Sequence, residues 1–215
     1  MALLHHATLT PSKRDLMAAW LATRDWCPDP DVTVVASYRF DDPAGEVGIE
    51  AAVLRTPDGT LLHVPLTYRG APLEGADAHL AGTMEHSVLG ARWVYDACGD
   101  PVGMAALATA VLTGGSEAEQ YFEEDGRREV REPSMTVRGS GSDEPSDASS
   151  PAADAVEPHD DGGVTTIRVD AREVLVARVL GTDLTAGGPV DGTLTGRWDG
   201  QEPVTLAAVR HLPTT

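Results

Sequence analysis

Five polar and aromatic side chains near the middle of the chain could together bind a polar ligand. The stretch VPLTYRGAP, residues 64–72, contains Tyr68 and Arg69, and the stretch GTMEHSVLGARWVYDACGDP, residues 82–101, contains His86, Arg92 and Asp96. Arginine matches the geometry of anionic groups, and histidine can exchange a proton near neutral pH. Because exposed, convergent polar groups mark binding sites, we take these five residues as a candidate groove.

Ordinary sheet packing is the alternative explanation for the same residues. Successive side chains of a strand point to opposite faces. Residues 60–69 therefore present two sets, Leu62, Val64, Leu66 and Tyr68 on the expected core face and His63, Pro65, Thr67 and Arg69 on the other. The same alternation makes Trp93 and Tyr95 core residues and leaves Arg92 and Asp96 facing solvent or paired. Both explanations stay open at the level of sequence.

Phosphoryl transfer is disfavoured by the residue types in the chain. A P-loop needs the pattern G-x-x-x-x-G-K-[ST], which does not occur. A kinase-like site needs a lysine for the phosphates and an asparagine for the metal ion. Lys13 is the single lysine, it lies at the start of the expected first helix, and the sequence has no asparagine. We therefore do not expect these residues to form a kinase site by themselves.

Motifs for hydrolysis and for metal binding are not found either. There is no G-x-S-x-G elbow, and Ser87 and His86 are adjacent in an expected strand, so they point to opposite faces. The histidines and cysteines form no H-x-x-x-H or C-x-x-C pattern. The catalytic residues, if any, stay unknown at the level of sequence, and we predict no metal ligand and no cofactor. Whether the chain is an enzyme is left open, with a non-enzyme favoured.

A helix and a strand meander are expected before the second half of the candidate groove. Ser12 can cap a helix that ends before Cys27-Pro28, because the residue before proline avoids the helical region. Strands rich in β-branched residues are expected at residues 31–40, 46–55 and 60–69. The short turns between them predict an antiparallel meander. Pro65 indicates an edge position or a bulge, since proline cannot donate a ladder hydrogen bond.

Two short strands and a second helix follow. Residues 84–88 and 92–95 are expected as strands, and Asp100-Pro101 starts a helix that runs to about Leu112. Gly114-Gly115 stops this helix, and Ser116 with a glutamate three residues later predicts another short helix.

The remainder of the chain divides into a polar segment and a set of short strands. Residues 139–163 hold seven acidic residues and no Lys or Arg, so we expect a disordered acidic linker. Strands are expected at residues 164–169, 174–180, 193–198 and 204–210. We expect residues 1–138 to form the main domain and the strand-rich segment 164–215 to pack on it, since four short strands offer a thin core.

The overall charge excludes several classes of partner. The 215 residues carry a formal net charge of -18, with 34 acidic and 16 basic residues. Binding to nucleic acid or to an anionic membrane needs clustered Lys and Arg, so neither is expected. Cys27 and Cys98 form no disulfide framework, and the amino terminus does not resemble a signal peptide. We therefore expect a cytoplasmic protein.

The same central residues resemble the N-terminal cap domain of actinobacterial maltokinases and their short relatives. The family pattern is a strand ending in P-L-x-Y-R-G-x-P-L, a histidine-containing strand, R-W-V-Y-D-A, and a helix that begins D-P. The matching residues here are Pro65, Leu66, Tyr68, Arg69, Gly70, Pro72, Leu73, His86, Arg92 to Ala97, and Asp100-Pro101. Trp20 and Trp26 fit the first helix, and the resemblance extends from about Leu3 to Phe122.

The resemblance implies an α+β fold, a curved antiparallel sheet packed on helices in a cystatin-like cap, to which the extra C-terminal strands would add. In maltokinases this cap precedes a kinase domain that makes maltose 1-phosphate from maltose and ATP. No segment after residue 138 matches that kinase domain, so none of its catalytic residues is transferred to this sequence.

Three functions follow from these expectations. The favoured one is a non-catalytic cap-type protein that binds or regulates something in maltose, trehalose or α-glucan metabolism, with a kinase acting in trans as a protein partner. The second is an enzyme acting on a sugar or sugar phosphate, of the kind labelled a glucan branching protein, with Arg69 and Arg92 contacting an anion and His86 as acid or base. The third is a protein–protein interaction module whose sheet edge accepts a partner's strand.

Overall fold

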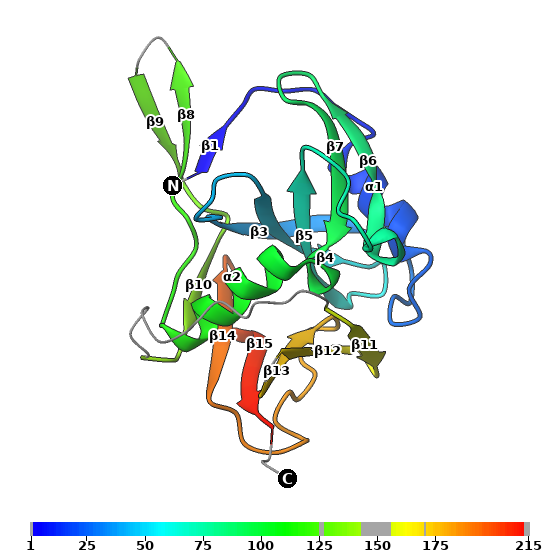
Figure 1. Ribbon diagram of the computed structural model, residues 1–215, viewed down its shortest axis with the longest axis vertical. Helices are drawn as coiled ribbons and strands as arrows, with labels where there is room; N and C mark the ends of the chain where they lie inside the picture. Colours follow the sequence, from blue (N-terminus) through cyan, green and yellow to red (C-terminus); the bar gives the residue numbers. More distant parts are fainter. Residues whose placement is uncertain (1, 125–126, 143–155, 170, 213–215) are drawn as a thin grey trace.

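The computed structural model describes residues 2–124, 127–142, 156–169 and 171–212. Within these residues the chain forms two six-stranded antiparallel sheets, one three-stranded sheet, two α-helices and two short 3-10 helices (Figure 1). The protein is therefore mostly β, whereas the expected α+β class gives helices a larger share. None of the described helices has the length and apolar character needed to span a bilayer.

The first six-stranded sheet contains the meander expected from the sequence. Its strands are β2 (Leu9–Thr10), β3 (Thr33–Phe40), β4 (Gly48–Arg55), β5 (Leu61–Arg69), β6 (Leu80–His86) and β7 (Gly90–Asp96). The spatial order is β2-β6-β7-β5-β4-β3, and every pairing is antiparallel. The sheet is curled, and the meander β3-β4-β5 is confirmed. The finer, cystatin-like arrangement stays a prediction.

Pro65 lies in a central strand, where the sequence favoured an edge or a bulge. It pairs in regular register with Ala51 of β4. On its other side, however, β7 pairs with β5 only from Leu66 onward. The preceding part of β5 contacts a different segment, because Leu62 forms an isolated bridge with Val179. Pro65 thus occupies the gap between two neighbours of β5, so its missing N–H interrupts no continuous ladder.

Helix α1 (Lys13–Leu21) covers one face of the first sheet. Ser12 caps it as expected, since its side chain accepts a hydrogen bond from the backbone N–H of Asp15. The buried residues of α1 pack in one cluster with the sheet residues Ala52, Leu54, Leu62, Val64, Leu66, Met84 and Val94. We call this face of the sheet the α1 face.

Helix α2 (Pro101–Leu112) packs on the opposite face, where it separates the two large sheets (Figure 1). Asp100 caps it by accepting a hydrogen bond from the N–H of Val102 at 3.0 Å. Its buried residues share a cluster with Tyr38, Ile49 and Val53 of the first sheet. The 3-10 helix η2 (Ala97–Gly99) joins β7 to α2, and η1 (Asp77–His79) precedes β6.

The second six-stranded sheet contains the four strands expected near the carboxyl end and two others. Its strands are β10 (Met135–Gly139), β11 (Pro158–Asp161), β12 (Val164–Val169), β13 (Arg172–Ala177), β14 (Gly192–Trp198) and β15 (Val204–His211). They are ordered β10-β14-β15-β13-β12-β11. Most of the expected linker, residues 143–155, lies outside the described residues. At its described ends the structure differs from the prediction, because β11 and the end of β10 are regular strands.

The second sheet shares the core of the first. Buried residues of β10, β12, β13, β14 and β15 belong to the same cluster as α2 and the α2-facing side of the first sheet. Gly139 lies so close to α2 that a side chain there would overlap the carbonyl oxygen of Ala110. Residues 164–215 therefore have no separate core among the described residues apart from a small outer cluster.

The third sheet replaces the short helix expected at Ser116. It consists of β1 (Ala2–Leu4), β8 (Gln120–Glu124) and β9 (Arg127–Arg131), and the β8–β9 hairpin projects from the body in Figure 1. Ser116 instead forms an isolated bridge with Arg138, and the Glu117 carboxylate accepts a hydrogen bond from the N–H of Val137. These long-range bonds hold the segment extended, so the helical capping box does not form.

Candidate functional site

The structure places four of the five candidate groove residues on one face of the first sheet and one on the other. Tyr68 pairs with Val94 in the β5–β7 ladder, and Met84 pairs with Arg92 in the β6–β7 ladder. Because paired residues share a face and alternate residues of a strand do too, Tyr68, His86, Arg92 and Asp96 all lie on the α1 face. Arg69 pairs with Trp93 and points to the opposite face. The groove containing all five stays a prediction.

Arg69 is held by the cap of helix α2. Its Nε and Nη2 donate to the two carboxylate oxygens of Asp100 at 2.7 and 2.6 Å. Asp100 is fully buried and also accepts a hydrogen bond from the Thr67 hydroxyl at 2.6 Å. Burial alone would raise the pKa of Asp100, but the bonds from Arg69 and Thr67 lower it below its usual value. This bidentate pair fixes the start of α2 against β5.

Asp96 is paired with Arg178, which follows β13 directly. Arg178 Nη2 donates to Asp96 Oδ2 at 2.5 Å, and the arginine side chain is only 1% exposed. Asp96 Oδ1 accepts the backbone N–H of Cys98 at 3.1 Å. Burial would lower the pKa of Arg178, but the Asp96 carboxylate raises it above the ordinary arginine value. The pair links the end of β7 to the second sheet.

A chain of hydrogen bonds extends from this pair to Trp26, in the loop that follows helix α1. Arg178 Nε donates to the Thr165 hydroxyl at 2.6 Å, and that hydroxyl donates to Asp160. The other carboxylate oxygen of Asp160 accepts the indole N–H of Trp26 at 3.2 Å. The guanidinium of Arg178 lies 5.2 Å from the ring centroid of Trp26, and its Nη1 is buried without a hydrogen-bond partner among the described residues.

Sequence reasoning did not identify Arg178, Thr165, Asp160 or Trp26 as parts of one network. One signal was available, because Arg178 interrupts the apolar run of residues 174–180. A charged residue in a run that reads as a buried strand must find a partner in the interior. Trp26 and Asp160 also line a pocket of about 470 Å³ beside the end of α1.

His86 and Arg92 lie near the β6–β7 turn and bind backbone groups of that turn. His86 Nδ1 accepts the N–H groups of Val88 and Leu89 at 3.2 and 3.1 Å. Arg92 Nη2 donates to the carbonyl of Leu89 at 2.7 Å. Burial, and then the neighbouring His5 and Arg92, lower the pKa of His86 below its usual value. The imidazole is therefore neutral at pH 7, with Nδ1 committed as an acceptor.

Tyr68 belongs to a polar cluster at the amino end of α1. Lys13 Nζ binds both carboxylate oxygens of Glu50, at 2.8 and 2.6 Å, and lies 5.2 Å from the centroid of the Tyr68 ring. Arg39 approaches the same carboxylate at 3.8 Å. Burial would raise the pKa of Glu50, but Lys13 and Arg39 lower it. The single lysine of the chain is thus occupied by an ion pair.

His63 is fully buried, whereas the sequence placed it on the face opposite the core. The expectation was wrong because the α2 face of β5 is covered by α2 and the second sheet. His63 Nδ1 lies 3.2 Å from the carbonyl of Ala177 and Nε2 lies 2.9 Å from the Tyr38 hydroxyl. A carbonyl only accepts, so Nδ1 carries the proton and Nε2 accepts from Tyr38. Burial and the nearby Arg178 lower the pKa of His63 to about 3.

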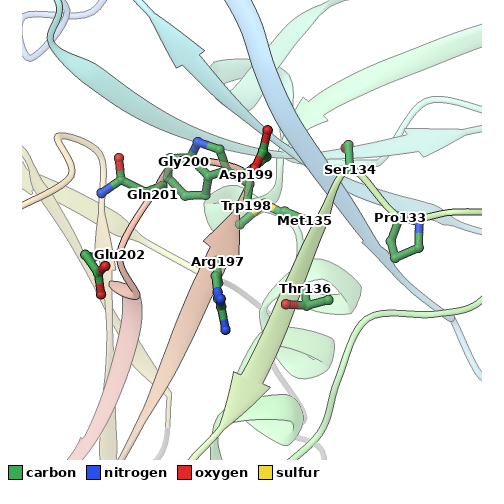
Figure 2. Close-up of a pocket in the computed structure, with 10 residues that line it drawn as sticks. All are labelled: Pro133, Ser134, Met135, Thr136, Arg197, Trp198, Asp199, Gly200, Gln201 and Glu202. Atoms are coloured by element: carbon green, nitrogen blue, oxygen red, sulfur yellow. The ribbon is translucent and has the colours of Figure 1, made fainter.

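A larger pocket, of about 680 Å³, opens where β10 begins and β14 ends. Figure 2 shows its lining, which consists of Pro133, Ser134, Met135, Thr136, Arg197, Trp198, Asp199, Gly200, Gln201 and Glu202. We call it the β10–β14 pocket. Met135 pairs with Trp198 and Thr136 pairs with Arg197. Alternation puts the first pair on the buried face and the second pair on the outer face.

The polar side chains of the β10–β14 pocket are mostly unpaired in the part of the chain that the structure describes. Among the described residues, no hydrogen bond or ion pair is found for the Arg197 guanidinium, the carboxylates of Asp199 and Glu202, or the Gln201 side-chain amide. Ser134 differs, since its hydroxyl donates to the carbonyl of Ser37 and accepts the N–H of the same residue. This bond ties the rim of the pocket to β3.

The described residues contain no group of three or more His, Cys, Asp or Glu side chains arranged to hold a metal ion. Cys27 and Cys98 are both free thiols, and burial raises the pKa of each.

Comparison with protein families supports the resemblance seen in the sequence. Residues 20–100 match the family model described as the maltokinase N-terminal cap domain. The match includes all five candidate groove residues, the end of α1 and the strands β3 to β7. It is narrower than the range from Leu3 to Phe122 expected above, and it covers less than half of the chain. No curated protein matched the chain.

Proposed function

We propose that the chain is a non-catalytic, cap-type protein that binds or regulates a component of maltose, trehalose or α-glucan metabolism, with a maltose-phosphorylating kinase in trans as its protein partner. The observation that carries this proposal is the match of residues 20–100 to the maltokinase N-terminal cap domain. We assign the cap role to residues 1–138, and residues 164–215 supply four of the six strands of the second sheet. We place the protein in the cytoplasm, where its two free thiols would stay reduced.

The ion pairs formed by three cationic side chains support a non-catalytic role. Phosphoryl transfer is catalysed by cations that are free to hold phosphate oxygens. Here Lys13 is bound to Glu50, Arg69 to Asp100 and Arg178 to Asp96, so each of these cations already neutralises a carboxylate. These three cations thus join elements of the fold.

The alternative of an enzyme acting on a sugar or sugar phosphate needs Arg69, Arg92 and His86 to converge. The ladder registers put Arg69 on the face opposite the other two. His86 Nδ1 is occupied by two backbone N–H groups, which leaves only Nε2 for proton transfer. These contacts favour the binding role over the enzymatic one. An interaction module without a sugar-related partner remains the third function to be tested.

The proposal is tested with the purified full chain and the maltose-phosphorylating kinase of the organism that encodes it. We expect the chain alone to give no turnover of ATP with maltose. We expect it to bind the kinase in calorimetry and to change the rate of maltose phosphorylation. An unrelated acidic protein of similar size and net charge controls for a non-specific electrostatic effect.

Two outcomes would contradict the proposal. ATP-dependent phosphorylation of a sugar by the chain alone would show that it is catalytic. A chain that neither binds the kinase nor changes its rate, but captures a partner unrelated to sugar metabolism, would favour the interaction module.

A further inference from the structure

The β10–β14 pocket offers hydrogen-bonding groups of both kinds. Arg197 supplies only donors, Asp199 and Glu202 supply only acceptors, and the Gln201 amide supplies both. In Figure 2 the Arg197 side chain lies between those of Thr136 and Glu202. A ligand that fits these groups must itself donate and accept in several directions. Hydroxyl groups do this, because each one carries a donor and two acceptor lone pairs.

The charges of the pocket argue against an anionic ligand. The lining contains one guanidinium and two carboxylates, so it is net negative, and the whole chain carries a formal charge of -18. A phosphate group would gain from Arg197 but would be repelled by Asp199 and Glu202, which are both unpaired among the described residues. A cationic ligand would be repelled by the Arg197 guanidinium. A neutral ligand with several hydroxyl groups is repelled neither by Arg197 nor by the two carboxylates.

Trp198 and Met135 lie on the buried face of the sheet and are only 7% and 2% exposed, so a ligand of this pocket is bound mainly by its polar groups. The volume of about 680 Å³ falls in the range of about 300–1,000 Å³ found for small-molecule sites.

The smaller pocket beside α1 is a weaker candidate. Its Trp26 and Asp160 are bonded to each other, and Arg24 donates to Thr23. These groups are already satisfied by the protein. In the β10–β14 pocket, by contrast, Arg197, Asp199, Gln201 and Glu202 have no partner among the described residues, so they can form hydrogen bonds with a ligand.

We propose that the β10–β14 pocket binds a neutral saccharide of one or two hexose units. The inference rests on the proposed function for its choice of sugars, and it assigns the sugar contact to the second sheet, outside the region that matches the cap family. Arg197, on strand β14, and Gln201, in the turn after it, bind hydroxyl groups of the sugar. Asp199 and Glu202 repel the phosphate of phosphorylated sugars.

The test measures binding to the full chain by calorimetry. Glucose, maltose and trehalose are titrated in parallel with glucose 1-phosphate and glucose 6-phosphate. We expect at least one neutral sugar to bind, and the phosphorylated sugars to bind at least about tenfold more weakly. Tighter binding of a phosphorylated sugar, or no binding of any neutral sugar, would overturn the inference.

Substitutions of two residues that line the pocket, the exposed Arg197 and the partly buried Gln201, test where the saccharide binds. Arg197→Ala and Gln201→Ala should each weaken saccharide binding by about tenfold, since each removes hydrogen bonds to the ligand. Arg55→Ala and Glu74→Gln are matched controls, because both residues are exposed and lie outside the pocket, and they should bind as the unchanged chain does. Circular dichroism melting of each variant verifies that the fold is retained.

The variants separate this inference from the proposed function. If Arg197→Ala binds the sugar with unchanged affinity, the site lies elsewhere and the inference fails, while an effect on the kinase would still stand. If no sugar binds but the chain regulates the kinase, only the inference fails. If a sugar binds at this pocket and the kinase is unaffected, the inference holds and the trans-acting role fails.

Discussion

At the scale of single residues, Asp96 and Arg178 show why a buried ion pair ties the fold together. Both side chains are at least nine-tenths buried, and the arginine also bonds Thr165. Each of the two buried charges is stabilised by the other, because neither is in contact with solvent that could stabilise it instead. Losing one partner should therefore cost far more than losing an exposed pair.

We expect Asp96→Ala to lower the free energy of unfolding by about 3–5 kcal/mol, because it leaves the Arg178 charge buried and unpaired. Asp31→Ala is the matched control, since Asp31 pairs with Arg14 in solvent, with side chains 77% and 50% exposed. That change should cost about 0–1 kcal/mol. Urea denaturation followed by tryptophan fluorescence measures both. Equal costs for the two variants would contradict the structural role of the pair.

His63 makes the stability depend on pH in a defined window. Its pKa is lowered from 6.5 to about 3 in the folded state, chiefly by burial and then by Arg178. Below pH 6.5 the unfolded chain therefore protonates His63, whereas the folded chain keeps it neutral. The contribution of His63 to the free energy of unfolding is fully present above pH 6.5 and is lost as the pH falls toward 3.

We expect the free energy of unfolding to fall by up to about 1.4 kcal/mol per pH unit below pH 6.5 from this one group. His63→Gln should remove that slope between pH 6.5 and 5, above the range in which carboxylates titrate. His159→Gln, which changes an exposed histidine, should leave the slope in place. Chemical denaturation at stepped pH tests this, and an unchanged slope in His63→Gln would refute the assignment.

At the scale of elements, the two α-helices have caps of very different importance. Ser12 caps α1 from an exposed position, and its side chain forms hydrogen bonds with Asp15 of the same helix. Asp100 caps α2 from the interior and also binds Thr67 and Arg69. The second cap therefore joins a helix to a sheet, whereas the first serves its own helix alone.

We expect Ser12→Ala to cost about 1 kcal/mol, as for an ordinary cap. Asp100→Ala should cost about 3–5 kcal/mol, because it also leaves the half-buried Arg69 without its carboxylate. Thermal unfolding of the two variants under the same conditions ranks them. Arg69→Ala in the Asp100→Ala background should add little further loss, and fully additive losses would show that the two residues do not act as a pair.

At the scale of the whole molecule, α2 and one continuous cluster of buried residues join the two large sheets. Val53 of β4 and Leu194 of β14 belong to the same cluster and are both fully buried. A protein with one shared core is expected to unfold in a single cooperative step. The two sheets should not behave as separate folding units.

We expect Leu194→Ala to destabilise the protein by about 2–5 kcal/mol and to weaken amide protection in β4 and β5 as well as in the second sheet. Val88→Ala, at an exposed position, is the control and should change neither. Hydrogen exchange followed by mass spectrometry resolves the strands. Loss of protection confined to β10, β14 and β15 would show two independent units.

Local features of the sequence were sufficient to locate most elements of this protein. The Ser12 and Asp100 caps, the meander β3 to β5 and strands β12 to β15 were expected close to where they occur, because capping and side-chain alternation act over a few residues. The match at residues 20–100 likewise depends on the order of residues along the chain.

Only the tertiary structure decided how the side chains are used. Asp96 and Arg178 are 82 residues apart, and Trp26 and Asp160 are 134 apart, so no local pattern could pair them. The burial of His63 required the second sheet to cover β5, and the β10–β14 pocket required residues 133–136 and 197–202 to meet. The physical reason is that strand patterns define faces, whereas packing between distant segments determines which faces are buried.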